Sequence, residues 1–112
     1  MDCIFCKIVA GEIPCKKVYE DENVLAFHDI EPQAQVHVLV IPKQHICCAN
    51  AIDESNSAAV TAVFTAIPKI AKALGLDAYR IINNCGEAAG QTVMHLHFHL
   101  LCDPEKLGAH LI

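Results

Sequence analysis

Several features that whole classes of proteins require are missing from this 112-residue sequence. It has no tryptophan, and only 8 lysines and arginines stand against 13 aspartates and glutamates, for a formal net charge of −5 at pH 7. Binding to a nucleic-acid backbone needs clustered cations, and the sequence has no such cluster. Nucleic acid is therefore not an expected partner, although a few backbone amides and imidazoles suffice to hold a single phosphate group.

Long apolar runs are also missing. The first residues, MDCIFCKIVAGEIP, include an acid at once and only a short, interrupted apolar stretch, unlike a secretory signal peptide. No apolar run approaches the length of a membrane span. We therefore expect a cytoplasmic protein that does not bind membranes. Its 7 cysteines are an odd number without a secretory context, which favours free thiols or metal ligands over a disulfide framework.

What the sequence does have is a high apolar content for its size. Hydrophobic residues make up 54% of the chain, and the mean hydropathy is +0.34. The length fits a single domain spanning residues 1–112, whose ratio of surface to volume is poor. We expect a partner subunit to cover part of this apolar surface.

Hydrophobic periodicity predicts an α+β domain, with a largely antiparallel sheet and the helices on one side of it. A short helix is predicted over 3–11 and a long one over 53–76. The predicted strands are 16–21, 22–30, 36–42, 78–84 and 94–101.

The long helix has one apolar stripe, formed by Val60, Val63, Phe64, Ile67, Ile70, Ala71 and Leu74. Asp53, Ser55 or Ser57 is expected to cap its start, and Gly75 to end it. Pro68 should remove one hydrogen bond and bend the helix.

The stretch MHLHFHLL, at 94–101, has histidine at every second position. On a strand, His95, His97 and His99 share one face, and the intervening Met94, Leu96, Phe98 and Leu100 face the core. A solvated face is a poor explanation, because such faces usually carry Lys, Glu, Thr or Ser. The spacing fits a metal site, and it equally fits phosphate chemistry by a nucleophilic imidazole. Spacing alone does not decide between them.

The segment before this stretch, NNCGEAAGQT, reads as a glycine-bounded loop. Its glycines allow amide N–H groups to converge on an anion, although glycines alone favour a flexible turn. Asn84, Gln91 and Thr92 add side-chain donors. Loop and histidine strand together are typical of a place for a phosphoryl group.

These residues carry a resemblance to a known family. MHLHFHLL matches the pattern His-φ-His-φ-His-φ-φ, with φ apolar, which is the signature of the histidine triad (HIT) family of nucleotide hydrolases and transferases. The segments CIFCKI, EIP, VYEDENVLAFHDI, VHVLVIPKQH and GQTVMHLHFHLL resemble the Hint branch of that family, in order and with similar spacing. The resemblance runs from about Cys3 to Leu101.

The resemblance implies a five-stranded antiparallel sheet with two helices, paired into a homodimer that extends the sheet. The implied reaction is hydrolysis of purine nucleoside phosphoramidates or related AMP or GMP conjugates through a nucleotidyl-histidine. His97 would be the nucleophile, with its proton held on Nδ1 by a main-chain carbonyl, implied to be that of His95. His99 would contact the phosphate or the leaving group, and His37 would orient or polarise the site.

Further roles follow from the same resemblance. Asn84, Gln91 and Thr92 would contact the phosphate and the leaving group, with Thr92 at a position that is commonly serine in this branch. Asp29 would bind the ribose hydroxyls, although on its own it reads as a turn or cap residue. Phe5, Ile8, Phe27, Ile30 and Leu39 would surround the base, although ordinary core packing explains them as well.

Cys3 and Cys6 form C-x-x-C, which alone is half of a zinc site. Microbial members of the branch complete it with the histidine of PKxH and the first triad histidine, which here are His45 and His95. The resemblance thus implies a structural zinc, with no metal required for catalysis. In the branch the C-terminal tail often crosses the dimer and shapes the leaving-group site, but residues 102–112 lack tryptophan, so leaving-group preference is not transferred.

Two other hypotheses stay open. One is a zinc-dependent hydrolase in which the triad histidines are the ligands. The other is a nucleotide-binding module whose turnover is incidental. Among the remaining cysteines, Cys47, Cys48 and Cys102 are alternative ligands or plain small hydrophobes, and Cys15 and Cys85 are expected to be free thiols, with Cys85 in the phosphate loop.

Overall fold

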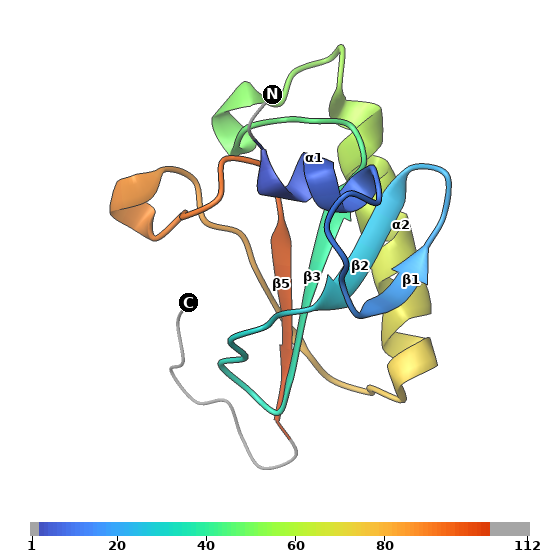
Figure 1. The fold of residues 1–112 in the computed structure, drawn as a ribbon. Coiled ribbons are helices and arrows are strands. Elements are labelled where there is room, and N and C mark those ends of the chain that lie inside the picture. Colours follow the sequence, from blue (N-terminus) through green and yellow to red (C-terminus); the bar gives the residue numbers. More distant parts are fainter. Residues whose placement is uncertain (1–2, 104–112) are drawn as a thin grey trace.

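The computed structural model describes residues 3–103, which form one antiparallel sheet with a helix on each face. The elements follow the order α1 (Ile4–Val9), β1 (Lys17–Glu20), β2 (Val24–His28), β3 (Val36–Pro42), α2 (Ser57–Leu74), β4 (Arg80–Ile82) and β5 (Phe98–Cys102). Short 3₁₀ turns cover Ala49–Ala51 and Glu87–Ala89. Figure 1 shows α1 across one face of the sheet and α2 behind the other.

The sheet confirms the expected five antiparallel strands in the order β1-β2-β3-β5-β4. Alternate residues of β2 and β3 face opposite sides, as the strand period of two requires. Val24, Ala26, Val38 and Val40 face α2, whereas Leu25, Phe27, Leu39 and Ile41 face α1. The expectation that the helices lie on one side is therefore wrong, because both faces of the central strands are apolar and each needs a cover.

The second helix packs Val63, Ala66, Ile67 and Ile70 against the sheet. Phe64, predicted in the buried stripe, is 46% exposed because the helix turns it to the edge of that stripe. The helix begins at Ser57 after Asn56, whose side chain makes no capping bond to the helix, so none of the three predicted caps lies at the N-cap position. Gly75 ends it in the left-handed conformation, as predicted.

Helix α2 also passes a length-and-composition test for crossing a membrane, with 18 residues and a mean hydropathy of 1.3. The helix contacts β1, β2 and β3, and a core helix that packs on a sheet passes the same test. The observation is therefore weak evidence for a span. The proposed role of the C-terminal tail falls mostly on residues 104–112, outside the described residues.

Pro68 lies inside α2 and is exposed, so its replacement tests how much the missing hydrogen bond costs. We expect Pro68→Ala to raise the free energy of unfolding by about 1–2 kcal/mol, because alanine restores the helix bond while the unfolded chain gains some freedom. Urea unfolding measures this. The matched control is Lys69→Ala, which should leave the free energy of unfolding nearly unchanged. Lys69 is also exposed, and lysine has a helix propensity similar to that of alanine. A loss of stability in Pro68→Ala would contradict the expectation.

Candidate active site and metal centre

The histidine stretch is less regular than predicted. Strand β5 begins only at Phe98, and residues 93–95 form a bend. Met94, expected in the core, is 42% exposed, whereas Leu96, Phe98 and Leu100 are buried under α2 as predicted. His95, His97 and His99 are all buried, and the bend sends His95 toward a different set of neighbours from His99. The period of two places all three on one face, but cannot show where the strand starts.

His97 has a defined tautomer. Its Nδ1 lies 2.6 Å from the main-chain oxygen of His95, and a carbonyl oxygen only accepts, so Nδ1 carries the proton and donates. The Nε2 atom of the neutral ring therefore holds a lone pair. Burial lowers the pKa of His97 below its ordinary value, which keeps the ring neutral near neutral pH. A buried, neutral imidazole with an unprotonated Nε2 is suited to nucleophilic attack.

Asn83 supports this arrangement from β4's end of the sheet. Its Nδ2 donates to the main-chain oxygen of His97 at 2.9 Å. Asn83 is not among the residues predicted for the site, which include the neighbouring Asn84, because nothing in the pair of asparagines shows which side chain turns toward the histidines. Asn84 is half-buried and also takes part in an interaction.

A relay of hydrogen bonds determines the protons of His37 and His99. The backbone N–H of Gln33 donates to Nδ1 of His37 at 3.0 Å, so the neutral ring of His37 carries its proton on Nε2. That Nε2 lies 2.8 Å from Nδ1 of His99. It donates there, which leaves the proton of neutral His99 on Nε2. The relay therefore presents His99 Nε2–H as a hydrogen-bond donor beside His97, whose ring centroid is 5.1 Å away.

Asp29 joins this group through its second oxygen. Its Oδ1 accepts from the backbone N–H of Glu31 at 2.8 Å, which is the turn role the residue type suggests on its own. Its Oδ2 lies 3.4 Å from Nε2 of His37. Asp29, His37 and His99 also lie within the distances of a metal site, but the proton on His37 Nε2 makes that nitrogen a poor ligand. The cluster fits a proton relay better than a metal centre.

The acidity of His99 gives a measurable pH dependence. Burial, helped by the neighbouring His97 and His37, lowers its pKa from 6.5 to about 4. Between these values the unfolded chain binds more protons than the folded one, so stability is complete above about pH 6.5 and falls toward pH 4. We expect wild type to lose more unfolding free energy between about pH 7 and pH 5 than His99→Asn does, measured by urea unfolding. Thr61→Ser, at an exposed residue that does not titrate, should keep the wild-type slope. Equal slopes for wild type and His99→Asn would contradict the assignment.

The glycine loop is held by Gln91. This side chain is 2% exposed, donates from Nε2 to the main-chain oxygens of Cys47 at 2.8 Å and Val93 at 3.0 Å, and accepts from the N–H of Gly86 at 2.8 Å. Its polar atoms thus bind the protein itself. The loop contains the 3₁₀ turn Glu87–Ala89, between Gly86 and Gly90 with positive φ values of 91° and 96°. Thr92 follows it and is exposed.

The residues expected around the base separate into two groups. Phe5, Ile8, Phe27 and Leu39 are buried together between α1 and the sheet, with the ring of Phe5 edge-on to His97 at 5.2 Å between centroids. Core packing accounts for them, and Phe5 also supports His97. Ile30 is 94% exposed and lies just after Asp29.

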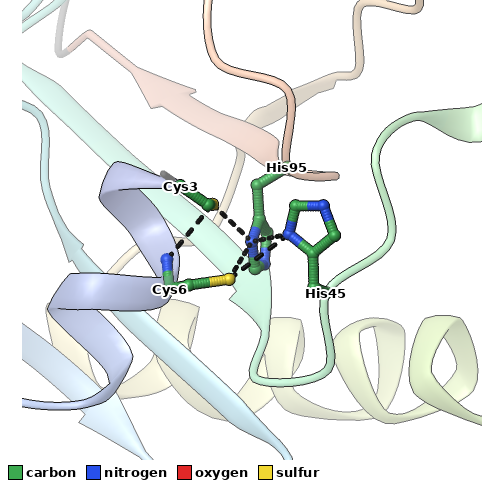
Figure 2. A group of neighbouring side chains, drawn as sticks. All are labelled: Cys3, Cys6, His45 and His95. Atoms are coloured by element: carbon green, nitrogen blue, oxygen red, sulfur yellow. Dashed lines mark hydrogen bonds between the residues drawn. The ribbon is translucent and has the colours of Figure 1, made fainter. Parts of the chain in front are cut away.

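The four predicted metal ligands come together. The ligand atoms of Cys3, Cys6, His45 and His95 lie within 4.8 Å of one another, from α1, the segment after β3 and the segment before β5 (Figure 2). Nδ1 of His45 lies 3.2 Å from Nδ1 of His95. Sulfur-to-nitrogen distances are 3.3 Å for Cys3–His95, 3.3 Å for Cys6–His45 and 3.6 Å for Cys6–His95. Tetrahedral zinc with its usual bond lengths requires about 3.3 Å between nitrogens and about 3.6 Å between sulfur and nitrogen, so the four residues fit zinc.

The surroundings of the cluster support the same fit. Nε2 of His95 donates to the main-chain oxygen of Pro42 at 2.8 Å, which directs an unprotonated Nδ1 at the cluster centre. Burial, with the nearby Cys3, raises the pKa of the Cys6 thiol to about 11. A dication at the centre would reverse this by stabilising the thiolate. Cys15, Cys47, Cys48, Cys85 and Cys102 lie outside this group and are free thiols.

Comparison with known proteins agrees with this geometry. Residues 10–105 match the HIT domain. The chain belongs to the HIT family. It is 48% identical to an uncharacterized HIT-like protein of Methanocaldococcus jannaschii, over 88% of this chain and 77% of that one. It is 41% identical to the adenosine 5′-monophosphoramidase hnt1 of Schizosaccharomyces pombe, over 95% of this chain and 77% of that one.

Solved structures agree over nearly the whole chain. A HIT family hydrolase from Clostridium thermocellum superposes with a TM-score of 0.92 at 48% identity, covering 99% of this chain and 97% of that one. A histidine triad protein from Clostridium difficile gives a TM-score of 0.91 at 49% identity, with the same coverage. The HIT fold expected from the resemblance is thereby confirmed, and its relatives support hydrolase activity.

Proposed function

We propose that this HIT protein hydrolyses purine nucleoside 5′-phosphoramidates, or related conjugates such as AMP–lysine, to the nucleoside monophosphate. The observation that carries the proposal is the 2.6 Å hydrogen bond from His97 Nδ1 to the His95 carbonyl, which leaves Nε2 unprotonated in a buried ring. The relative named as an adenosine 5′-monophosphoramidase supports the choice of substrate class.

The two steps use the protons as the relay arranges them. Nε2 of His97 attacks the α-phosphorus, the bond from phosphorus to the amine nitrogen breaks, and the leaving amine takes its proton from a solvent water, while Nε2–H of His99 donates a hydrogen bond to a phosphoryl oxygen. A nucleotidyl-histidine remains. Water then attacks the same phosphorus, returns a proton to the solvent, and releases the monophosphate and neutral His97. His37, held by the Gln33 amide, orients His99 in both steps.

Substrate contacts are proposed around this centre. Asp29 Oδ2 would accept from the ribose hydroxyls, and Asn84 and Thr92 would contact the phosphate or the leaving group. Gln91 would act by holding the glycine loop, in view of its internal hydrogen bonds. Ile30 is exposed and available to a base, whereas Phe5, Ile8, Phe27 and Leu39 would form the apolar floor.

We further propose that zinc binds Cys3, Cys6, His45 and His95 and has a structural role. When bound, it would join α1 to the segment after β3, which contains His45, and to the segment before β5, which contains His95. The ligand set is complete without His97 or His99, so the metal leaves the proposed catalytic atoms unliganded. We also propose a cytoplasmic homodimer that extends the sheet. Sedimentation velocity would test the dimer, and the edge strand β4, with Ile81 38% exposed, is consistent with it.

The proposed reaction is tested by AMP release from adenosine 5′-phosphoramidate, with the guanosine compound assayed in parallel. Acid quenching during turnover should trap the nucleotidyl group on the peptide that contains His97, as read by mass spectrometry. Turnover should survive chelation for as long as the protein stays folded. Binding without turnover would favour a nucleotide-binding module, and turnover lost on chelation in a folded protein would favour a zinc-dependent hydrolase.

A further inference from the structure

Cys47 and Cys48 form a pair of neighbouring thiols that the proposed reaction does not use. Their sulfurs lie 3.3 Å apart, Cys47 is exposed and Cys48 is half-buried. The two residues lie outside the four-residue metal cluster. Successive residues of an extended backbone point their side chains to opposite sides. Cys48 is extended, with φ −167° and ψ 174°, so the close approach of the two sulfurs is a specific local arrangement.

The peptide between these cysteines also anchors the glycine loop. The main-chain oxygen of Cys47 accepts the hydrogen bond from Nε2 of Gln91 at 2.8 Å. Oε1 of the same glutamine accepts from the N–H of Gly86 at 2.8 Å. One peptide unit thus supports the buried side chain that holds the loop of residues 86–91, and that loop leads directly into the histidine stretch.

We propose that Cys47 and Cys48 are a reversible two-thiol modification site, at which a low-molecular-weight disulfide oxidises the pair and loosens the loop of residues 86–91. The thiolate of exposed Cys47 attacks the small disulfide and releases one small thiol. The thiolate of Cys48 then attacks Sγ of Cys47 and releases the second. The protein loses two protons and two electrons, and the small disulfide is reduced to two thiols.

The bond is easily reversed because adjacent cysteines make a strained disulfide. Neighbouring Cα atoms are about 3.8 Å apart across a trans peptide. Ordinary disulfides separate their Cα atoms by roughly 4.4–6.8 Å, and deviations store strain that makes the bond more reducible. Strained and exposed disulfides have the more oxidising potentials that are typical of labile, regulatory bonds. The pair is thus suited to switching and poorly suited to holding the fold.

Oxidation reaches the loop because the new ring includes the peptide unit that binds Gln91. Closing the ring draws the two sulfurs together from 3.3 Å to the length of a covalent bond and turns that peptide unit. The carbonyl then no longer points at Nε2 of Gln91, whose buried amide loses a partner. The consequence for catalysis rests on the proposed function, whereas the bond and the loop opening do not.

The test treats the full chain, with zinc supplied, with oxidised glutathione and then alkylates the remaining thiols in denaturant. Wild type should lose two alkylatable thiols, and peptide mapping should place the link within the Cys47–Cys48 segment. Amide hydrogen exchange in residues 86–91 should become about fivefold faster, the effect of losing one net hydrogen bond. Phosphoramidate turnover should fall, and dithiothreitol should restore both exchange and turnover.

Two variants make the result specific. Cys48→Ser should form no disulfide ring and should retain glutathione on Cys47. Once that adduct is removed, amide hydrogen exchange in residues 86–91 should be as slow as in the reduced protein. Cys15→Ser, a matched control at a thiol beneath α1, should behave as wild type. A link between Cys3 and Cys6, or a ring without faster loop exchange, would overturn the proposal. Ring formation and faster exchange in a protein without any turnover would support this site and refute the proposed reaction.

Discussion

Replacement of His97 by alanine is expected to lower kcat/KM for adenosine 5′-phosphoramidate by on the order of 10⁴-fold or more. Among the described residues, the variant loses the only triad nitrogen that is unprotonated, accepts no hydrogen bond and lies outside the metal cluster. His99 cannot replace it, because its Nδ1 accepts from His37 and its Nε2 carries the proton. His95 cannot, because its Nδ1 faces the cysteines. AMP release in steady state measures the loss.

The control is His28→Ala, at an exposed histidine of β2 outside both clusters, which should keep turnover within about twofold. Zinc content and circular dichroism of His97→Ala should match wild type. The ring of His97 contacts Phe5 and donates to the main-chain oxygen of His95, but it makes no hydrogen bond to the side chain of a proposed metal ligand. A variant that folds and retains a tenth of wild-type activity would refute nucleophilic catalysis by His97, whatever the fate of the zinc.

Sequence periodicity predicted the elements of the fold well, and their relation in space less well. The β-branched, apolar run over 36–42, closed by a proline, predicted β3 with its observed bounds, and Gly75 predicted the end of α2. The placement of the two helices on opposite faces was not predicted, because β2 and β3 are apolar on both faces. Their sequences therefore do not indicate a single side for the core. The bend at 93–95 was missed because alternating hydrophobicity continues through it.

The site shows the same division between residue type and geometry. The short motifs indicate the triad, His37, Asp29, Cys3, Cys6 and His45, and the structure brings them together in two clusters, with His97 next to His99. The roles of Gln91 and Asn83 depend on which side chain turns inward, which is decided by burial and by carbonyl groups that no local pattern reveals. The proton positions needed three carbonyl or amide contacts, from Pro42, His95 and Gln33, and these exist only in the folded chain.

Loss of the proposed zinc is expected to lower the Tm of the protein but to leave its kcat nearly unchanged. Cys3→Ser should reduce bound zinc from one per chain to a small fraction, measured by elemental mass spectrometry, because the remaining three ligands bind far more weakly. Cys3 also accepts the N–H of Cys6 as the N-cap of α1, a bond that the serine hydroxyl can keep, so the variant loses the metal but retains the cap. We expect Tm to fall by about 10 °C or more, which corresponds to a few kcal/mol in a domain of this size.

The decisive comparison is between that loss of stability and turnover below the new Tm. Cys15→Ser, which removes a thiol outside the cluster, should retain zinc and most of the wild-type Tm. With Cys3→Ser held well below its Tm, kcat should stay within several-fold of wild type, because the proposed catalytic Nε2 atoms of His97 and His99 lie outside the proposed ligand set. A protein that remains folded but loses kcat together with zinc would place the metal in the reaction, since a purely structural ion acts on activity only through the folded fraction.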